Sequence, residues 1–187
     1  MAAKPSNWVL NVVYIPQQCY HSSVPADVLA HIRGAVQKTG KLDGRTSLVS
    51  IRTITEPSHP AFGQCGLFAA KKIPPRTHII DYSGEVHADE RQSDYDLSLY
   101  RSQDGNVNIG IDACKMGNEA RFINDYRGIR SKPNAVFQER RADSGELRMS
   151  VWTSSLPLKK NEEILVSYGK GWWQARAAEG AVPIESQ

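Results

Sequence analysis

The second half of the chain alternates apolar and polar positions with the two-residue period of β-strands. Leu147, Met149 and Val151 alternate with side chains of the opposite face, which predicts a half-buried strand. Other short apolar segments, separated by turn residues, predict strands at residues 67–69, 78–82, 107–111, 135–137 and 164–168. Helical patterns are few and short, near residues 117–122 and 172–178. The expected fold class is therefore mainly β with small helices.

The first sixty residues carry a different pattern. β-branched and aromatic runs at residues 8–15 and 48–54 each predict a strand. Between them, Pro25 precedes a segment whose apolar side chains fall on one helical face, so a helix is expected to run as far as Gly40. The side chains on that face are Val28, Leu29, Ile32 and Val36. We expect residues 1–60 to be an N-terminal flank packed on the domain that follows.

Composition narrows the range of partners. Hydrophobic residues make up 40% of the 187 residues and charged residues 23%, as in ordinary globular proteins. The formal charge of +3 is too small to indicate nucleic-acid binding, and the longest apolar run is too short to span a membrane. Cys19, Cys65 and Cys114 are too widely spaced for a zinc motif, so no metal is predicted. A monomeric intracellular protein with reduced thiols is expected.

Four short motifs follow one another in the rest of the chain. They are residues 66–69 (GLFA), 81–85 (DYSGE), 111–124 (IDACKMGNEARFIN) and 161–169 (NEEILVSYG). In this order they resemble the motifs of the SET domain, the domain of a large family of protein-lysine methyltransferases. Any one motif alone would be weak evidence. The resemblance covers residues 61–170 and leaves residues 171–187 as a C-terminal tail.

The resemblance implies both a fold and an activity. The fold is the SET-domain β fold, with knot-like threading of residues 121–124 past residues 163–168. The activity is transfer of a methyl group from S-adenosylmethionine to the side-chain amine of a lysine in a protein substrate. Cofactor and substrate would enter from opposite faces and meet in a narrow channel. A nuclear location is expected, with the cytoplasm as the alternative.

The resemblance also assigns the cofactor site to individual residues. In the family, main-chain groups of the glycine turn contact the methionine part of the donor, so Gly66 would allow a close backbone approach. The amide of Asn124, which both donates and accepts hydrogen bonds, would meet the amino-acid end of the donor. The expected cofactor-binding residues are Gly66, Leu67, Phe68, Arg121, Phe122, Asn124 and Asp125.

Three tyrosines, Tyr168, Tyr82 and Tyr95, are the expected catalytic residues. The hydroxyl of Tyr168 would align the lysine nitrogen and accept weak C–H hydrogen bonds from the cationic methyl group. The substrate lysine, whose ordinary pKa is about 10.4, must first lose its proton, which a dry aromatic channel favours. The expected channel residues are Tyr95, Val166, Trp172 and Trp173, the last two as an aromatic lid or as the packed face of a C-terminal helix.

Several positions depart from the family pattern. Gln64 replaces the first glycine of the glycine turn, Asp125 replaces the histidine after the asparagine, and residues 126–132 lengthen the link to Pro133. Val166 stands where Phe or Tyr usually influences the number of methyl groups added. No cysteine clusters flank the domain, so another element must close the channel. The segment 164–169 also resembles PR domains, relatives in which activity varies.

The substrate is expected to be a lysine-containing protein such as a basic histone tail. Six acidic residues and a single basic one lie between Asp81 and Asp96, in the family's variable insert beside the peptide groove. A solvated acidic face explains this charge equally well. Two alternatives remain open: a methyltransferase acting on a ribosomal or translation protein, and an inactive SET/PR-like binding module.

Overall fold

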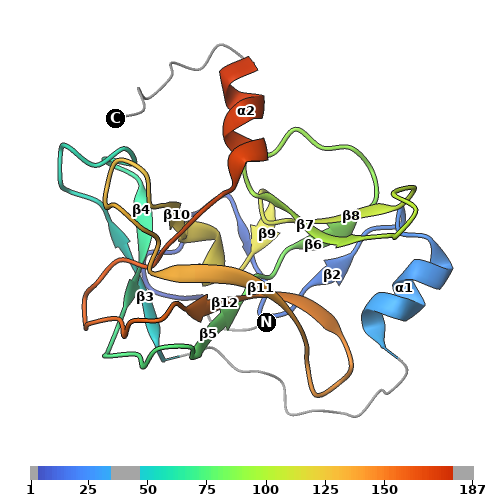
Figure 1. Cartoon of the computed structure of the whole chain (residues 1–187), viewed down its shortest axis with the longest axis horizontal. Helices are drawn as coiled ribbons and strands as arrows, with labels where there is room; N and C mark the ends of the chain where they lie inside the picture. The colour runs from blue at the N-terminus through green and yellow to red at the C-terminus, as the bar shows by residue number, and fades with distance from the viewer. Residues whose placement is uncertain (1–3, 35–46, 179–187) are drawn as a thin grey trace.

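The computed structural model describes residues 4–34 and 47–178, and within them short strands dominate (Figure 1). The mainly β fold class with small helices is thereby confirmed. No helix among these residues is long and apolar enough to cross a membrane. In chain order the elements are β1 (Val13–Tyr14), β2 (Cys19–Tyr20), α1 (Ala26–Arg33), β3 (Val49–Thr53), β4 (Cys65–Ala69), β5 (His78–Asp81), β6 (Glu85–His87), β7 (Asp96–Arg101), β8 (Asn108–Asp112), β9 (Met116–Gly117), the 3-10 helix η1 (Glu119–Phe122), β10 (Asn124–Asp125), β11 (Ala135–Arg141), β12 (Leu147–Thr153), β13 (Leu165–Val166) and α2 (Lys170–Ala178).

The strands form several small sheets rather than one large one. The largest has the order β2-β6-β8-β7, and a second has the order β11-β12-β5. Three further pairs are β1 with β9, β3 with β4, and β10 with β13. In Figure 1 the β3–β4 pair lies at the opposite end of the molecule from the four-stranded sheet and α1, and α2 rises away from the sheets.

The N-terminal flank is built into three of these sheets. Strand β1 runs parallel to β9, β2 runs parallel to β6, and β3 pairs antiparallel with β4 over five residues. Each partner strand carries or adjoins one of the sequence motifs. The flank therefore supplies backbone hydrogen bonds that the strands of the motif-bearing region would otherwise lack.

The predicted strand at residues 8–15 is wrong over most of its length, since only Val13 and Tyr14 are extended and paired. The reason is local packing of Trp8. Its ring makes edge contacts with the rings of Tyr14 and Phe122, at centroid distances of 5.1 and 5.4 Å, and its indole nitrogen donates to the carbonyl of Val12. These contacts turn the segment back on itself, which an extended strand cannot do.

Helix α1 is shorter than its pattern predicts. It ends at Arg33, because Gly34 adopts φ +76° and its N–H closes the last turn on the carbonyl of Ala30. A Cβ on residue 34 would also meet the backbone of Gly145 at 2.5 Å. Glycine is therefore required at position 34, where the helix ends. Val36 and Gly40 lie outside the described residues.

The sequence patterns do not predict strands β2, β6, β7, β9 and β10. Strands β6 and β10 have three and two residues, too few for any period to be visible. Strand β7 lies in the stretch that sequence reasoning treated as an acidic insert, and it pairs with β8 at the edge of the largest sheet. Strand β11 is longer than predicted and extends to Arg141, because it pairs along its whole length with β12, the next strand, across a hairpin whose turn includes Gly145 at φ +84°.

The hydrophobic core is continuous across the sheets and α1. Its members are contributed by the flank, by all four motifs and by the hairpin, so the chain packs around one core. The largest side chains with almost no exposed surface are Ile32, Leu67, Ile73, Ile79, Leu99, Ile109, Ile111, Leu158, Ile164, Leu165, Val86 and Val151.

A partly buried ion-pair network holds the three-stranded sheet. The Asp81 carboxylate on β5 accepts hydrogen bonds from Arg140 at 2.6 Å, Arg148 at 2.9 Å and Ser150 at 2.6 Å, and lies 2.7 Å from His78. Burial acts to raise the pKa of Asp81. The hydrogen bonds from His78, Arg140, Ser150 and Arg148 outweigh burial and hold the pKa well below its usual range. This network fixes the strand that leads into Tyr82.

Candidate active site

The third and fourth motifs meet where β10 and β13 run side by side in parallel. Asn124 is opposite Leu165, and Asp125 is opposite Val166. The backbone N–H of Tyr126 continues the pairing by donating to the carbonyl of Val166 at 3.0 Å. The structure thus joins the two segments that the sequence resemblance brings together, while their knot-like threading stays a prediction.

Asn134, which follows the lengthened loop, fixes β13 from its other side. Its side-chain oxygen accepts the N–H of Leu165 at 2.8 Å, and its side-chain nitrogen donates to the carbonyl of Glu163 at 2.8 Å. Its backbone N–H donates to the carbonyl of Leu165 at 3.1 Å. A two-residue strand is marginal alone, and these bonds explain why β13 is held in register.

Tyr168 stands directly after this strand and is fixed at both its backbone and its ring. Its hydroxyl donates to the carbonyl oxygen of Ile123 at 2.7 Å, and its backbone N–H donates to the Asp125 carboxylate at 2.7 Å. Burial, followed by the negative charge of Asp125, raises the pKa of the Tyr168 hydroxyl far above its ordinary value. The hydroxyl is therefore un-ionised at neutral pH, with its hydrogen committed to Ile123.

The three candidate catalytic tyrosines come together in space. The buried Tyr82 hydroxyl donates to the carbonyl of Tyr95 at 2.8 Å. The pKa of Tyr82 is raised by burial first and then by the proximity of Tyr168, with a smaller contribution from Tyr95. These residues come from the second motif, the insert and the fourth motif, so the fold alone brings them to one place.

Arg121 and Phe122 act mainly as packing residues beside these tyrosines. The Arg121 guanidinium lies 4.2 Å from the centre of the Tyr95 ring and 5.0 Å from that of Phe122, and its Nε donates to the carbonyl of Ala113. Both side chains are buried. Arg121 thereby holds the Tyr95 ring in place, an arrangement that stabilises a cation between aromatic faces.

The glycine turn approaches Asn124 through a third residue, Glu163. The Asn124 amide nitrogen donates to Glu163 Oε1 at 2.9 Å and lies 3.5 Å from the carbonyl of Cys65. A Cβ on Gly66 would meet the same Glu163 oxygen at 2.7 Å. Gly66 thus makes room for this carboxylate, a close approach that the sequence resemblance attributes to the cofactor alone.

Leu67 and Phe68 differ in what they can offer to a bound molecule. Leu67 is fully buried, and its carbonyl already accepts the N–H of Ile164 at 2.8 Å, so it serves the core. Phe68 is half-buried, with the Arg52 guanidinium 5.4 Å from its ring centre and a bridge to Glu163. Phe68 therefore borders the Gly66–Asn124 region, whereas Leu67 lies beneath it.

Asp125 connects the tyrosine site to α2. Its carboxylate pairs with Arg127 at 2.9 Å and lies 3.4 Å from the indole nitrogen of Trp173, besides accepting from Tyr168. The Trp172 ring makes an edge contact with the Tyr168 ring at 5.0 Å. Trp172 therefore contacts Tyr168 directly and Trp173 contacts Asp125, while the expected role of the two tryptophans as channel residues stays a prediction. Val166 is fully buried in the core cluster beside this group.

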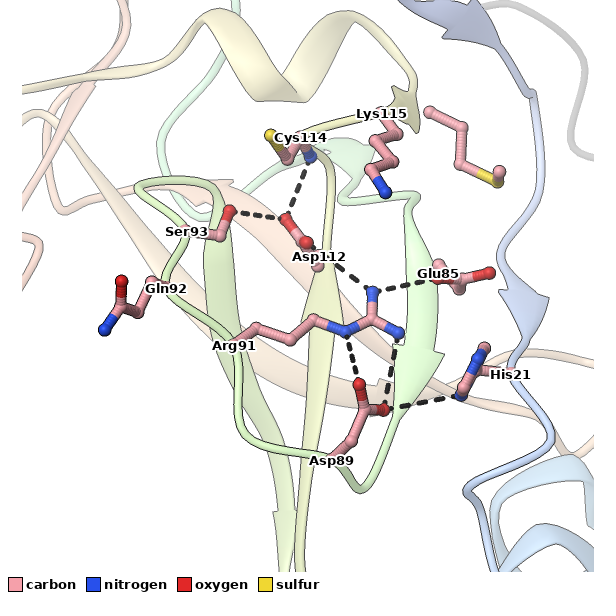
Figure 2. Close-up of a pocket in the computed structure, with 10 residues that line it drawn as sticks. His21, Glu85, Asp89, Arg91, Gln92, Ser93, Asp112, Cys114 and Lys115 are labelled. Carbon is pink, nitrogen blue, oxygen red and sulfur yellow. Dashed lines mark hydrogen bonds and ion pairs between the residues drawn. The ribbon is translucent and has the colours of Figure 1, made fainter.

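A separate polar cavity of about 410 Å³ lies where β2, β6 and the end of β8 meet (Figure 2). Figure 2 shows the Arg91 guanidinium at its centre, 2.8 Å from Glu85, 3.2 Å from Asp89 and 3.5 Å from Asp112. Ser93 donates to Asp112 at 2.7 Å. Its hydroxyl also accepts the backbone N–H of the next-but-one residue, Tyr95, so the cavity wall supports a candidate catalytic residue.

The acidic stretch between residues 81 and 96 is largely paired inside the fold. Asp81 contacts two arginines, and Glu85 and Asp89 both contact Arg91. Asp96 lies 3.0 Å from the buried His87 ring. Much of the negative charge counted in the sequence is therefore compensated by neighbouring side chains, which reduces the field that an acidic groove wall would present.

Among residues 4–34 and 47–178, no group of three or more His, Cys, Asp or Glu side chains is arranged to hold a metal ion. The three cysteines are free thiols, with Cys114 exposed.

Sequence reasoning did not single out Glu163, His59 or the side chain of Asp125. Glu163 belongs to the fourth motif, but two consecutive glutamates, Glu162 and Glu163, are typical of a solvated surface. His59 carries no signal, because its contact with Glu163 spans 104 positions. The carboxylate of Asp125 bonds to three partners, Arg127, Tyr168 and Trp173, and no local pattern indicates these contacts.

Comparison with known proteins places these observations in a family. The family model of the SET domain matches residues 64–169, and no curated protein matches the chain in sequence. The chain is similar to ATXR5, solved in complex with a histone H3.1, with TM-score 0.59, 17% identity, and coverage of 86% of this chain and 82% of that one.

A second solved structure is Polycomb Repressive Complex 2 of Chaetomium thermophilum, with TM-score 0.52 and 22% identity. The match covers 72% of this chain and 18% of that one, so the chain spans under a fifth of that protein. Both likenesses show the fold, and together with the family match they confirm the expected SET-domain β fold.

Proposed function

The chain belongs to the SET-domain family, and we propose that it is a protein-lysine methyltransferase that uses S-adenosylmethionine. The methyl acceptor is the side-chain amine of a lysine in a protein. Histone tails are the proposed substrate class, and the nucleus is the proposed compartment. The family match and the assembled tyrosine site support it.

One observation carries the proposal: the Tyr168 hydroxyl hydrogen is donated to Ile123. A phenol has one hydrogen to donate and two lone pairs that accept. Because its hydrogen is committed, the Tyr168 oxygen faces any incoming group purely as an acceptor. An acceptor at this point suits a substrate amine and the hydrogens of a cationic methyl group.

S-adenosylmethionine supplies, when bound, an electrophilic methyl group on a sulfonium. The residues present fit this molecule, because Gly66 exposes bare backbone next to Glu163 and Asn124 offers an amide beside the same carboxylate. Asn124 would hold the amino-acid end, and the half-buried Phe68 would border it. Leu67, Arg121 and Phe122 support these residues through packing.

The substrate lysine must reach Tyr168 as a neutral amine. Tyr82, Tyr95 and Tyr168 surround the site with aromatic carbon, and Trp172 adds a further ring. Removal from water disfavours an ammonium ion and lowers its pKa. The Asp125 carboxylate is not available as a base, because it is occupied by Tyr168, Arg127 and Trp173.

The proposed histone substrate rests on two considerations. ATXR5 was solved in complex with a histone, and its fold matches 86% of this chain. Strand β7 is an edge strand of the four-stranded sheet, and an extended peptide can add to such an edge. A ribosomal or translation protein would satisfy the same chemistry and forms the alternative substrate class.

The experiment combines binding and transfer. Calorimetry with S-adenosylmethionine should give one site per chain. Incubation with a labelled donor should then label lysine residues in core histones more strongly than in purified ribosomes or translation factors. Stronger labelling of the second group would favour the alternative class. Binding without any transfer would indicate a binding module, and a folded protein that binds no donor at about millimolar concentration would contradict the proposed function.

A further inference from the structure

We propose that His59 and Glu163 are positioning residues for the cofactor: they fix the orientation of the Asn124 amide so that its oxygen receives the α-ammonium group of the donor. This inference rests on the proposed function and adds to it a residue from outside the matched family region, residues 64–169.

The three side chains form an unbroken hydrogen-bonded chain. Glu163 Oε2 lies 3.0 Å from His59 Nε2, and Glu163 Oε1 accepts from Asn124 Nδ2 at 2.9 Å. The side chains of His59 and Glu163 are only 8% and 10% exposed. Both ends of the carboxylate are thus occupied, and in this shielded setting each bond restricts rotation strongly.

The backbone decides which His59 nitrogen carries the proton. The N–H of Ala61 donates to His59 Nδ1 at 3.0 Å, so Nδ1 must be the acceptor. In the neutral ring the hydrogen therefore sits on Nε2, facing Glu163. The N–H of His59 is itself tied to the carbonyl of Glu56 at 3.1 Å. The loop before β4 thereby presents a fixed donor to the carboxylate.

The carboxylate in turn decides which way the Asn124 amide faces. Glu163 and the carbonyl of Cys65 can only accept, so the amide must direct its NH₂ group toward them. Among the described residues, none donates a hydrogen bond to Asn124 Oδ1. The amide oxygen is consequently the atom left for a ligand, and an acceptor oxygen suits an ammonium group.

Gly66 shows that the carboxylate position is built into the fold. A side chain there would collide with Glu163 Oε1 at 2.7 Å, with Phe68 at 3.0 Å and with Ile54 at 3.2 Å. Glu163 therefore packs against the bare backbone of the glycine turn. Its negative charge also lies within the same region as the proposed ammonium, which adds a favourable interaction.

The test compares two ligands that differ only in the α-ammonium group. The first is S-adenosylhomocysteine, and the second is its analogue with hydrogen in place of the α-ammonium. Their dissociation constants are measured by calorimetry for the wild type and for His59→Phe, Glu163→Gln and His59→Gln. Glu163→Gln keeps the shape of the side chain but replaces one acceptor oxygen by an NH₂ group. That group faces the N–H of either His59 or Asn124, so one hydrogen bond of the three residues is lost without creating a cavity.

We expect His59→Phe and Glu163→Gln to weaken S-adenosylhomocysteine binding roughly tenfold, and binding of the analogue by less than about twofold. His59→Gln, whose amide can replace the Nε2–H donor, should restore affinity to within about threefold of wild type. His31→Gln on α1, at the opposite end of the molecule in Figure 1, is the control and should change neither constant.

Equal weakening of both ligands would overturn the inference, since it would indicate general damage to the site. Unchanged affinity for both ligands would overturn it as well. Failure of the wild type to bind S-adenosylhomocysteine would instead contradict the proposed function, so the two failures are distinguishable.

Discussion

The hydroxyl group of Tyr168 donates its hydrogen to the carbonyl oxygen of Ile123 across 2.7 Å, joining the fourth motif to the third through residues 45 positions apart in the chain. The contact holds the ring at a set angle and leaves the phenol oxygen as an acceptor. Burial and the charge of Asp125 raise the pKa of the Tyr168 hydroxyl, so the phenolate that could act as a base is hardly populated at neutral pH. Positioning, rather than proton abstraction by Tyr168, is therefore its proposed contribution.

Replacing Tyr168 by phenylalanine tests that role. We expect transfer to fall by roughly a hundredfold or more, because the oxygen acts only at the reacting centre. Donor binding should stay nearly unchanged, since the ring and its contact with Trp172 remain. Single-turnover kinetics and calorimetry measure the two effects. Tyr20→Phe on β2, whose hydroxyl bonds to Glu146, is the matched control. Retained transfer in Tyr168→Phe would remove the Tyr168 hydroxyl from the mechanism.

Alkaline pH should destabilise the protein partly through Tyr168. Its pKa is raised in the folded state, so its stabilising contribution is complete below the ordinary tyrosine pKa of about 10 and is lost as the pH rises above it. Urea unfolding between about pH 9 and pH 11 should show that the free energy of unfolding falls more steeply with pH for the wild type than for Tyr168→Phe. Parallel pH dependences would contradict the assignment.

Acid should weaken the fold through Asp81. Its pKa is held low in the folded state, so its contribution is present above the ordinary value of about 4 and is lost as pH falls below that. Asp81→Asn leaves Arg140 and Arg148 without their shared carboxylate and should cost about 3 kcal/mol at neutral pH. Chemical unfolding at two pH values, with Asp143→Asn as control, measures both effects. If the free energy of unfolding of Asp81→Asn fell with decreasing pH as steeply as that of the wild type, the prediction would be refuted.

Trp172 should matter for the protein substrate more than for the donor. Its ring packs on Tyr168 on the side of α2, so Trp172→Ala opens the site to water without touching Asn124 or Gly66. We expect the KM for a lysine peptide to rise several-fold and the Kd for the donor to change by less than about twofold. Steady-state kinetics at saturating donor tests this. A selective loss of donor binding would place Trp172 on the cofactor side instead.

Val166 should permit more than one methyl group. Valine has no hydroxyl to hold a water beside the amine and is smaller than the Phe or Tyr of the family pattern, so a methylated nitrogen keeps room to rotate. Mass spectrometry over time should show di- or trimethyllysine, and Val166→Tyr should shift products toward monomethyllysine. Because Val166 is fully buried, the melting temperature of the variant must be checked in parallel. A wild-type reaction that stops at one methyl group with excess donor would contradict the prediction.

The sequence by itself determined the fold class and the family. Alternation at Leu147, Met149 and Val151 predicted β12, and the ordered motifs indicated the SET domain before any contact was known. These signals are local, since they depend only on residues near one another in the chain. The ends of strands were predicted less accurately. In the segment around Trp8, side-chain packing overrode the propensity for extended structure.

Only the tertiary structure decided how the site is held together. The contacts of Ile123 with Tyr168 and of His59 with Glu163 join positions 45 and 104 residues apart, and no periodicity or spacing can indicate them. The same holds for Asp125, whose carboxylate reaches Trp173. Polar groups buried in a fold must find partners, and which partners they find depends on how the sheets pack rather than on the neighbouring sequence.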